Sequence, residues 1–360
     1  MDRILSNKVF IRSGSCISAL GNSVDDAWLK LQSNTSGVEL HAEKWEGRIK
    51  GLEGNRFNSL LDRILDSIKI HEAGILLQED TQLIISTTKA NIEEMPDNAF
   101  QSMMLKVQSV LGLSTEPIIV SNACISGIVA INLAADFIKI ENCSKVIVLG
   151  IDVLSEFVST GFNALFALSD SLCKPYDKQR KGINLGEAAA YVVLSNSRKS
   201  KSFSAQYLAG ASSNDANHIS GPSRTGEGLY RAIKKTLNRA SLHADDIDFV
   251  QAHGTATLYN DEMESIAFNR LCLTETPSNS FKAYIGHTLG AAGIIETIFA
   301  LKCLEENTLI KSLGYGEHGL SMPMHIVEQN KTSQLNTVIK SGSGFGGGNA
   351  ALIFKKVEQQ

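Results

Sequence analysis

The stretch Ile118-Ile-Val-Ser-Asn-Ala-Cys-Ile-Ser-Gly127 runs from a β-branched apolar segment, through a cysteine, into a row of small and apolar residues. This pattern predicts a strand followed by a helix over residues 125–140, with Cys124 at the turn between them. We expect a lowered pKa for the thiol, because amides and the dipole at a helix N-terminus favour a thiolate. Ala123 and Gly127 keep the turn thin and the helix close to its packing partner, as a nucleophile at such a turn requires. The alternative is that Cys124 is a small core residue.

Two further segments present a histidine where a buried run turns. They read Gln251-Ala-His-Gly-Thr-Ala-Thr257 and Lys282-Ala-Tyr-Ile-Gly-His-Thr-Leu-Gly-Ala-Ala-Gly293. A single histidine is more often structural, but His253 and His287 both lie beside glycine or small residues, whereas the other histidines have polar neighbours. A cysteine with two imidazoles and Lys282 is typical of acyl-thioester chemistry, in which a thiolate stores an acyl group and the imidazoles act on a second substrate. The three segments therefore predict an enzyme.

Apolar runs alternate with helical patterns along the rest of the chain. Strands are expected near residues 9–11, 83–86, 118–120, 146–149, 206–211, 248–252 and 350–355, and helices near 24–32, 58–72, 125–140, 228–240, 262–271 and 291–305. This alternation predicts an α/β fold with buried, largely parallel strands. The segments 188–194 and 349–354 both enter a strand after a glycine-rich turn, which indicates a duplication. We expect two halves, 1–200 with the cysteine and 201–360 with the two histidines.

The composition fits a globular enzyme and argues against other classes. The 360 residues are 43% hydrophobic and 20% charged, with a net charge of -4, which gives a large core but no basic field for nucleic acid. We expect no membrane span, because no apolar run is long enough, and a cytoplasmic location, because no signal sequence is recognisable. The 6 cysteines form no C-x-x-C pair, so neither a zinc site nor a disulfide framework is indicated.

Further blocks occur between and after these segments. They are Gly161-Phe-Asn-Ala-Leu-Phe-Ala-Leu-Ser169, Lys174-Pro-Tyr-Asp-Lys-Gln-Arg180 with Leu185-Gly-Glu187, and Gly344-Phe-Gly-Gly-Gly-Asn-Ala350. Together with the three segments, they resemble the β-ketoacyl-acyl-carrier-protein synthases of the I/II type, which are condensing enzymes of the thiolase-like superfamily. The resemblance extends over essentially the whole chain. It implies a duplicated α-β-α-β-α layered fold with two five-stranded mixed sheets.

The resemblance also implies roles for individual residues. Cys124 corresponds to the acylated nucleophile, and His253 and His287 correspond to the two catalytic histidines. Lys282 falls at the position of a lysine that supports the second histidine electrostatically, and Glu296 matches the acidic partner of that lysine. No metal and no redox cofactor are implied, because the substrates arrive on the phosphopantetheine of an acyl carrier protein.

Other residues match positions that bind the substrates. The backbone amides of Cys124 and Phe345 correspond to an oxyanion hole, and the Phe345 ring to a gate over the cysteine. Thr255 and Thr257 correspond to hydroxyls that bind the phosphopantetheine arm. Two plainer interpretations stay open: the threonines satisfy only turn backbone, and Phe345 is only a core aromatic.

A Cys-His-His set is similar to the elongating, decarboxylating branch of this family. It implies a decarboxylative Claisen condensation of an acyl group on Cys124 with malonyl-acyl carrier protein, in fatty-acid, polyketide or polyene synthesis. The implied partners are the acyl carrier protein and a second subunit, either an identical chain or a related condensing-enzyme subunit. Two alternatives remain: a non-catalytic subunit resembling a chain-length factor, against which Cys124 argues, and an acyltransferase or hydrolase of the same fold.

Overall fold

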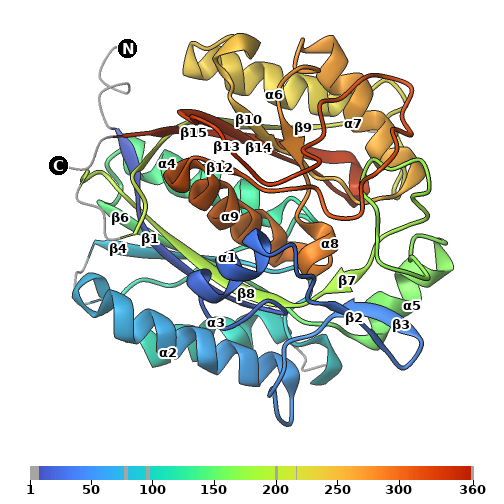
Figure 1. The fold of residues 1–360 in the computed structure, drawn as a ribbon. Coiled ribbons are helices and arrows are strands. Elements are labelled where there is room, and N and C mark those ends of the chain that lie inside the picture. Colours follow the sequence, from blue (N-terminus) through green and yellow to red (C-terminus); the bar gives the residue numbers. More distant parts are fainter. Residues whose placement is uncertain (1–7, 77–79, 95–97, 199–201, 216, 358–360) are drawn as a thin grey trace.

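The computed structural model describes residues 8–76, 80–94, 98–198, 202–215 and 217–357, and layers of strands and helices alternate in it (Figure 1). Two helices in the middle lie between strand layers, and pairs of helices cover the two outer faces. The central pair is α4 (Ser126–Lys139) and α9 (Ala292–Glu306); the outer pairs are α2 (Arg56–Leu76) with α3 (Ala99–Leu111), and α6 (Glu227–Ala240) with α7 (Leu258–Arg270). The predicted α/β fold is confirmed.

The strands form one continuous hydrogen-bonded ladder in the order β11-β10-β14-β15-β9-β1-β8-β6-β4-β5. Its members are β1 (Val9–Ser18), β4 (Thr81–Ser86), β5 (Ile118–Val120), β6 (Lys145–Asp152), β8 (Ala188–Ser195), β9 (Ala205–Asn214), β10 (Phe249–Gln251), β11 (Ser278–Asn279), β14 (Thr337–Ser343) and β15 (Gly348–Lys356). The expected two separate sheets are joined here, because the start of β1 pairs with β9 from Val9↔Tyr207 to Ile11↔Ala205.

The sheet is mixed, as the resemblance implied, and the prediction of largely parallel strands was wrong. β4 is parallel to β5 and β6, and β10 is parallel to β11 and β14. The strands β1, β8, β9 and β15 are antiparallel to every neighbour. A parallel neighbour needs a crossover of a dozen or more residues, whereas only residues 344–347 connect β14 to β15. Apolar runs alone do not reveal this difference.

The predicted helices lie close to their observed positions. The helix α1 (Val24–Gln32) begins after Ser23, whose side chain accepts a hydrogen bond from the Asp26 amide as an N-cap. The prediction omitted several elements: α3, α5 (Glu156–Ala164), α8 (Lys282–Ile285), the short strands β2 (Val38–His41), β3 (Lys44–Gly47), β7 (Leu185–Gly186), β11, β12 (Thr308–Leu309) and β13 (Lys331–Thr332), the 3-10 turns η1 (Ile92–Glu94), η2 (Ala244–Asp246), η3 (Leu289–Ala291) and η4 (Phe345–Gly347), and the strand β14. In the described part of the chain, no helix has the length and apolar character that crossing a bilayer requires.

Three apolar clusters fill the spaces between the layers. The central cluster packs α4 and α9 between the two strand layers, the second packs α2 and α3 on one outer face, and the third packs α6 and α7 on the other. Burial of these apolar surfaces supplies the main favourable free energy of folding. The predicted junction of the two halves at residue 200 lies outside the described residues.

The central helices cross at two glycines. A Cβ atom added to Gly293 would lie 2.5 Å from the amide nitrogen of Ile128, and one added to Gly127 would lie 2.9 Å from that of Ile294. Only glycine permits this approach, so Gly127 does keep its helix close to a packing partner, as predicted. The crossing brings together the N-terminal ends of α4 and α9.

Candidate active site

Cys124 lies at the strained turn between β5 and α4. The preceding residue, Ala123, has a φ of 44°, which is unfavourable for a residue with a Cβ atom. The hydroxyl of Ser126 fixes the turn, because it accepts a hydrogen bond from the Asn122 amide at 2.7 Å and donates one to the Ala123 carbonyl at 2.6 Å. The sulfur therefore precedes the helix, where the sequence predicted it.

The predicted low pKa of this thiol is wrong. Burial raises the pKa of Cys124 to about 11. The charge of Lys282 and the backbone amides of Phe345 and Cys124 act in the opposite direction, while the charge of Asp152 adds to the rise. Since desolvation outweighs the favourable contacts, Cys124 is a thiol near neutral pH.

The structure brings Cys124, His253 and His287 together in one buried cluster. One side-chain ligand atom from each residue lies within 4.8 Å of the others. The two imidazole rings meet edge to face, with centroids 5.3 Å apart and an interplanar angle of 85°. His253 follows β10, and His287 follows α8, so three segments distant in sequence converge at the crossing of the central helices.

Hydrogen bonds determine which ring nitrogen carries the proton. Nδ1 of His287 accepts from the Leu289 amide at 3.3 Å, and Nδ1 of His253 lies 3.3 Å from the Lys282 ammonium, which can only donate. Burial, followed by the charge of Lys282, lowers the pKa of His287 to about 3 and that of His253 well below its usual value. Both rings are thus neutral with the proton on Nε2.

This tautomer gives the site two N–H donors beside a thiol. Nε2 of His287 is buried and has no hydrogen-bond partner in the described residues. A buried donor without a partner costs free energy, so a bound carbonyl oxygen or enolate oxygen would be stabilised there. The same protons oppose a bound metal, although the Cys-His-His spacing is compact, because ligation needs the lone pair of a ring nitrogen.

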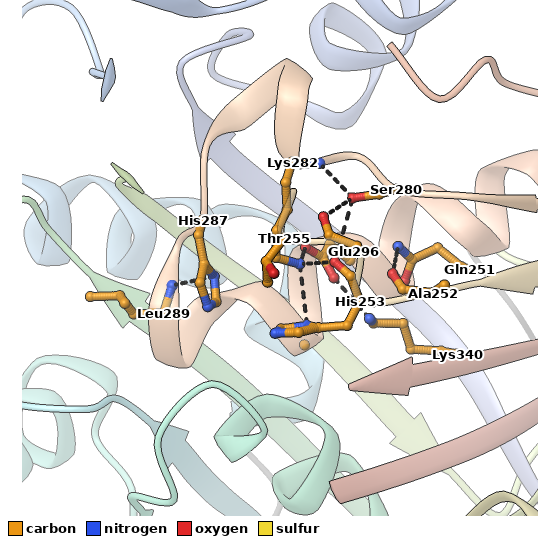
Figure 2. Close-up of polar contacts among 12 residues, drawn as sticks. Gln251, Ala252, His253, Thr255, Ser280, Lys282, His287, Leu289, Glu296 and Lys340 are labelled. Carbon is orange, nitrogen blue, oxygen red and sulfur yellow. Dashed lines mark hydrogen bonds and ion pairs between the residues drawn. The ribbon is translucent and has the colours of Figure 1, made fainter. Parts of the chain in front are cut away.

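Behind His253 lies a buried cluster of two lysines and a carboxylate (Figure 2). The Lys282 ammonium donates to the His253 carbonyl at 2.6 Å and forms an ion pair of 2.6 Å with Oε1 of Glu296. Its direct contacts therefore go to His253, whereas the resemblance implied support for the second histidine. The other oxygen of Glu296 pairs at 2.8 Å with Lys340 of β14.

Sequence reasoning missed Lys340. The available signal was a lysine between apolar and small residues in the segment Val338-Ile-Lys-Ser-Gly342, which forms part of a buried strand. A lysine in such a run is costly to bury unless a carboxylate neutralises it. Pairing it with Glu296, however, requires the tertiary structure.

Two carboxylates of α7, also missed, hold the turn that carries His253. Glu264 accepts hydrogen bonds from the amides of His253 and Gly254, both at 2.7 Å, and Asp261 accepts from the Thr255 amide at 3.0 Å. Burial, with the nearby charge of Asp261, raises the pKa of Glu264 to about 7. These bonds fix the direction in which the imidazole leaves the backbone.

A cavity of about 840 Å³ leads to the cluster. Thr255 and Thr257 line it, and their hydroxyls lie 2.8 Å apart. The Thr255 hydroxyl also accepts a hydrogen bond from the Thr257 amide at 3.4 Å, so it stabilises the turn as well as facing the cavity. Phe345 also lines the cavity and is 36% exposed, which argues against a core aromatic. Its ring stacks on Phe162 of α5 at 5.2 Å.

Comparisons with known proteins agree with this geometry. Residues 72–200 match the family model described as "Beta-ketoacyl synthase, N-terminal domain", and residues 205–316 match "Beta-ketoacyl synthase, C-terminal domain". A 3-oxoacyl-[acyl-carrier-protein] synthase 2 of Rhizobium meliloti is 33% identical over 66% of this chain and 60% of its own length. Nodulation protein E of Rhizobium leguminosarum is 30% identical over 76% of this chain and 70% of its own length.

The fold also matches a solved structure over nearly its full length. A ketosynthase in complex with its chain length factor, from Xenorhabdus doucetiae, gives a TM-score of 0.88 at 25% identity, covering 98% of each chain. The matched region of this chain spans about three fifths of the length of the first curated relatives, 61% and 60%.

Proposed function

The chain belongs to the β-ketoacyl synthase family, and from that premise we propose that it is a 3-oxoacyl-acyl-carrier-protein synthase, an acyltransferase that forms carbon–carbon bonds. Its reaction is the decarboxylative condensation of an acyl group on Cys124 with malonyl-acyl carrier protein. The observation that carries this proposal is the cluster of a buried thiol with two imidazoles, each of which faces a donor with Nδ1 and so leaves Nε2 as the proton-bearing nitrogen.

The first step transfers the acyl group to Cys124. The new carbon–sulfur bond forms as the bond to the carrier thiol breaks, and the Cys124 proton ends on the departing thiol. The backbone amides of Cys124 and Phe345 stabilise the tetrahedral oxyanion, consistent with their effect on the pKa of the sulfur. Because the proton moves from one thiol to the other, the high pKa of Cys124 requires no permanent thiolate.

The second step uses the two imidazoles. The thioester oxygen of the malonyl group accepts the Nε2–H bonds of His253 and His287, so loss of carbon dioxide leaves a stabilised enolate. The enolate carbon attacks the acyl carbon, and the bond to Cys124 breaks. The sulfur then recovers a proton from solvent, and the product is the 3-oxoacyl thioester.

The cavity and the sheet edge support the proposed partners. Thr255 and Thr257 bind the phosphopantetheine arm of the acyl carrier protein, and the stacked rings of Phe345 and Phe162 gate entry. The solved relative is a complex of a ketosynthase with its chain length factor. In this chain β5 ends the strand order with its residues half-buried, so we infer a dimer, with an identical or related subunit, that pairs through this strand.

We also infer that the chain is duplicated as 1–200 and 201–360, with a five-stranded group of the sheet in each half. The support is the strand order, because β5-β4-β6-β8-β1 and β11-β10-β14-β15-β9 repeat the same pattern of parallel and antiparallel pairs. The cytoplasmic location and the absence of a metal or redox cofactor stay predictions.

A hydrolase or acyltransferase of the same fold would also acylate Cys124. It would have no use for two neutral N–H donors aimed at a second substrate, and a non-catalytic subunit would not need the thiol. Intact-mass spectrometry separates these functions when the protein is given an acyl thioester and ¹³C-labelled malonyl thioester on a bacterial acyl carrier protein. Condensation adds two labelled carbons and releases carbon dioxide, hydrolysis returns the free acid, and a non-catalytic subunit stays unacylated. The control is Cys272→Ala, which removes an exposed thiol outside the cavity.

A further inference from the structure

Lys340 is a buried cation that the mechanism above does not use. It lies in β14 with 1% of its surface exposed, after the fully buried Val338 and Ile339. Its ammonium is 2.8 Å from Oε2 of Glu296 and donates to the carbonyl of Ser341 at 2.6 Å. Burying a lysine is costly even when it is paired, so its place beside the imidazoles calls for a functional explanation.

The cluster holds two ammonium groups and one carboxylate. Lys282 occupies Oε1 of Glu296, and Lys340 occupies Oε2. Burial favours the protonated acid, but the two lysines together hold the pKa of Glu296 below its usual value. Burial lowers the pKa of Lys340, and the charge of Glu296 acts in the opposite direction. With both lysines protonated, the cluster carries a net charge of one positive unit, and Lys282 presents it directly to the ring and carbonyl of His253.

We propose that Lys340 is a positioning residue of the condensing site, which acts by sharing the carboxylate of Glu296 with Lys282, so that the cluster behind His253 keeps a net positive charge. The positive charge adds to burial in keeping both imidazoles in the neutral Nε2–H form, and it favours the negative charge of an enolate that accepts hydrogen bonds from those N–H groups. If Lys340 were absent, Glu296 would neutralise Lys282, and a proton on either imidazole would meet less repulsion. The kinetic part of this inference rests on the proposed function.

The other charged groups around His253 do not replace this effect. Glu264 of α7 faces the backbone of His253 and Gly254 rather than the ring, and His287 is neutral. The titratable groups on the side of the ring are Lys282 of α8, His287, Glu296 of α9, Lys340 of β14 and the thiol of Cys124, and those on the side of the backbone are Glu264 and Asp261 of α7. After burial and Lys282, the charge of Lys340 adds to the lowering of the pKa of both histidines.

A set of variants that changes the net charge of the cluster tests the proposal. Lys340→Met lowers the charge from +1 to 0, while the double variant Lys340→Met with Glu296→Gln restores +1 with neither partner present. Lys340→Gln has the same charge as Lys340→Met but keeps a donor for Glu296. The control is Lys302→Met, which breaks the 2.6 Å ion pair with Glu306 elsewhere on α9.

Two readouts separate this inference from the proposed function. Nitrogen NMR of labelled histidines, assigned with His253→Ala and His287→Ala, reports ring protonation without any turnover. Decarboxylation of a malonyl thioester against pH, beside the rate of Cys124 acylation, reports the effect on the reaction. An inactive wild-type protein would contradict the proposed function, and the NMR titration would still decide the role of Lys340.

In Lys340→Met and Lys340→Gln, we expect the protonation midpoint of the imidazoles to rise by about one pH unit. Decarboxylation should fall about tenfold near neutral pH, where the rings stay neutral but the enolate loses the stabilising positive charge, while acylation stays within roughly threefold. The double variant should recover both properties, and Lys302→Met should change neither. Unchanged midpoints, a double variant no better than the single ones, or loss of the folded state in both single variants would overturn the proposal and leave Lys340 a structural role.

Discussion

The two halves of the sheet use one strand order for two kinds of chemistry. In the first half, the helix after β5 is α4, which begins beside Cys124, and in the second half the central helix after β11 is α9, which carries Glu296. The thiol comes from the first half, whereas His253, His287 and the lysines that pair with Glu296 come from the second. Under the proposed function, one half stores the acyl group and the other activates the extender.

Burial acts on the two halves in opposite senses. It raises the pKa of Cys124 to about 11 and lowers that of His287 to about 3. Because desolvation disfavours the charged form of each group, the thiol and the imidazoles are all neutral near pH 7. The charges of the site lie one layer behind, in the cluster of Glu296 with its two lysines.

The largest effect should come from the second half. We expect His253→Ala and His287→Ala to lose decarboxylation by roughly 10²–10⁴-fold, since each removes an N–H donor to the enolate oxygen. Acylation of Cys124 should persist in both, as measured by intact mass. The exposed His318→Ala is the control. If either histidine variant decarboxylated normally but was not acylated, the assignment of decarboxylation to the second half would be wrong.

Gly293→Ala should weaken the contact between the central helices of the two halves. Its Cβ would lie 2.5 Å from the backbone of Ile128, so α9 must shift away from α4 at a cost of about 1–3 kcal/mol. Urea denaturation should show this loss together with a lower condensation rate. Gly74→Ala, in α2, meets nothing within 4 Å and should not destabilise the protein. If the two variants had equal urea midpoints, the close crossing of α4 and α9 would not contribute to stability as argued.

The neutral imidazoles predict a dependence of stability on pH. Histidine has an ordinary pKa of 6.5, and in the folded chain that of His287 is about 3, so between these values the unfolded chain binds a proton that the folded one does not. Its contribution is intact above about pH 6.5 and is lost as pH falls toward 3, at about 1.4 kcal/mol per pH unit. Unfolding free energies from pH 4.5 to 7 should therefore have a shallower slope in His287→Asn, and parallel slopes would show that the ring is not held neutral.

The smallest effect on activity should come from the proposed gate, in which the ring of Phe162 from the first half stacks on the ring of Phe345 from the second. Phe345→Ala and Phe162→Ala should both relax selectivity among acyl chain lengths, by less than about tenfold, because either change removes the stacked pair. Competition between acyl thioesters measures this. Phe157→Ala, 70% exposed on the same helix as Phe162, is the control. Unchanged selectivity in both gate variants would refute the gate.

The local pattern of the sequence was sufficient to predict the positions of the cysteine and the two histidines in the fold, although it missed Lys340 and the carboxylates of α7. Apolar runs that end in a cysteine or histidine placed Cys124, His253 and His287 at element ends, and a lysine and glutamate from one stretch proved to be paired. Strand direction was not predictable from apolar runs, because buried parallel and antiparallel strands have similar composition.

The pKa of the thiol and the role of Lys340 required the three-dimensional structure. The helix-end argument for Cys124 was sound locally, but desolvation depends on what the fold packs over the sulfur, and that effect is larger. Likewise, β14 delivers Lys340 to Glu296 across a contact between a strand and a helix that are distant in sequence. The pKa of Cys124 and the pairing of Lys340 with Glu296 both depend on tertiary packing around the site, which the local sequence of each segment does not reveal.

The division of labour is tested most directly in Cys124→Gln, which removes the nucleophile and places a neutral amide where the acyl thioester would lie. We expect this variant to accept no acyl group and yet to release carbon dioxide from malonyl-acyl carrier protein at a rate no lower than that of the wild type. Adding His287→Ala should abolish the release. If Cys124→Gln released no carbon dioxide, or if release persisted without His287, the second half would not activate the extender as described here.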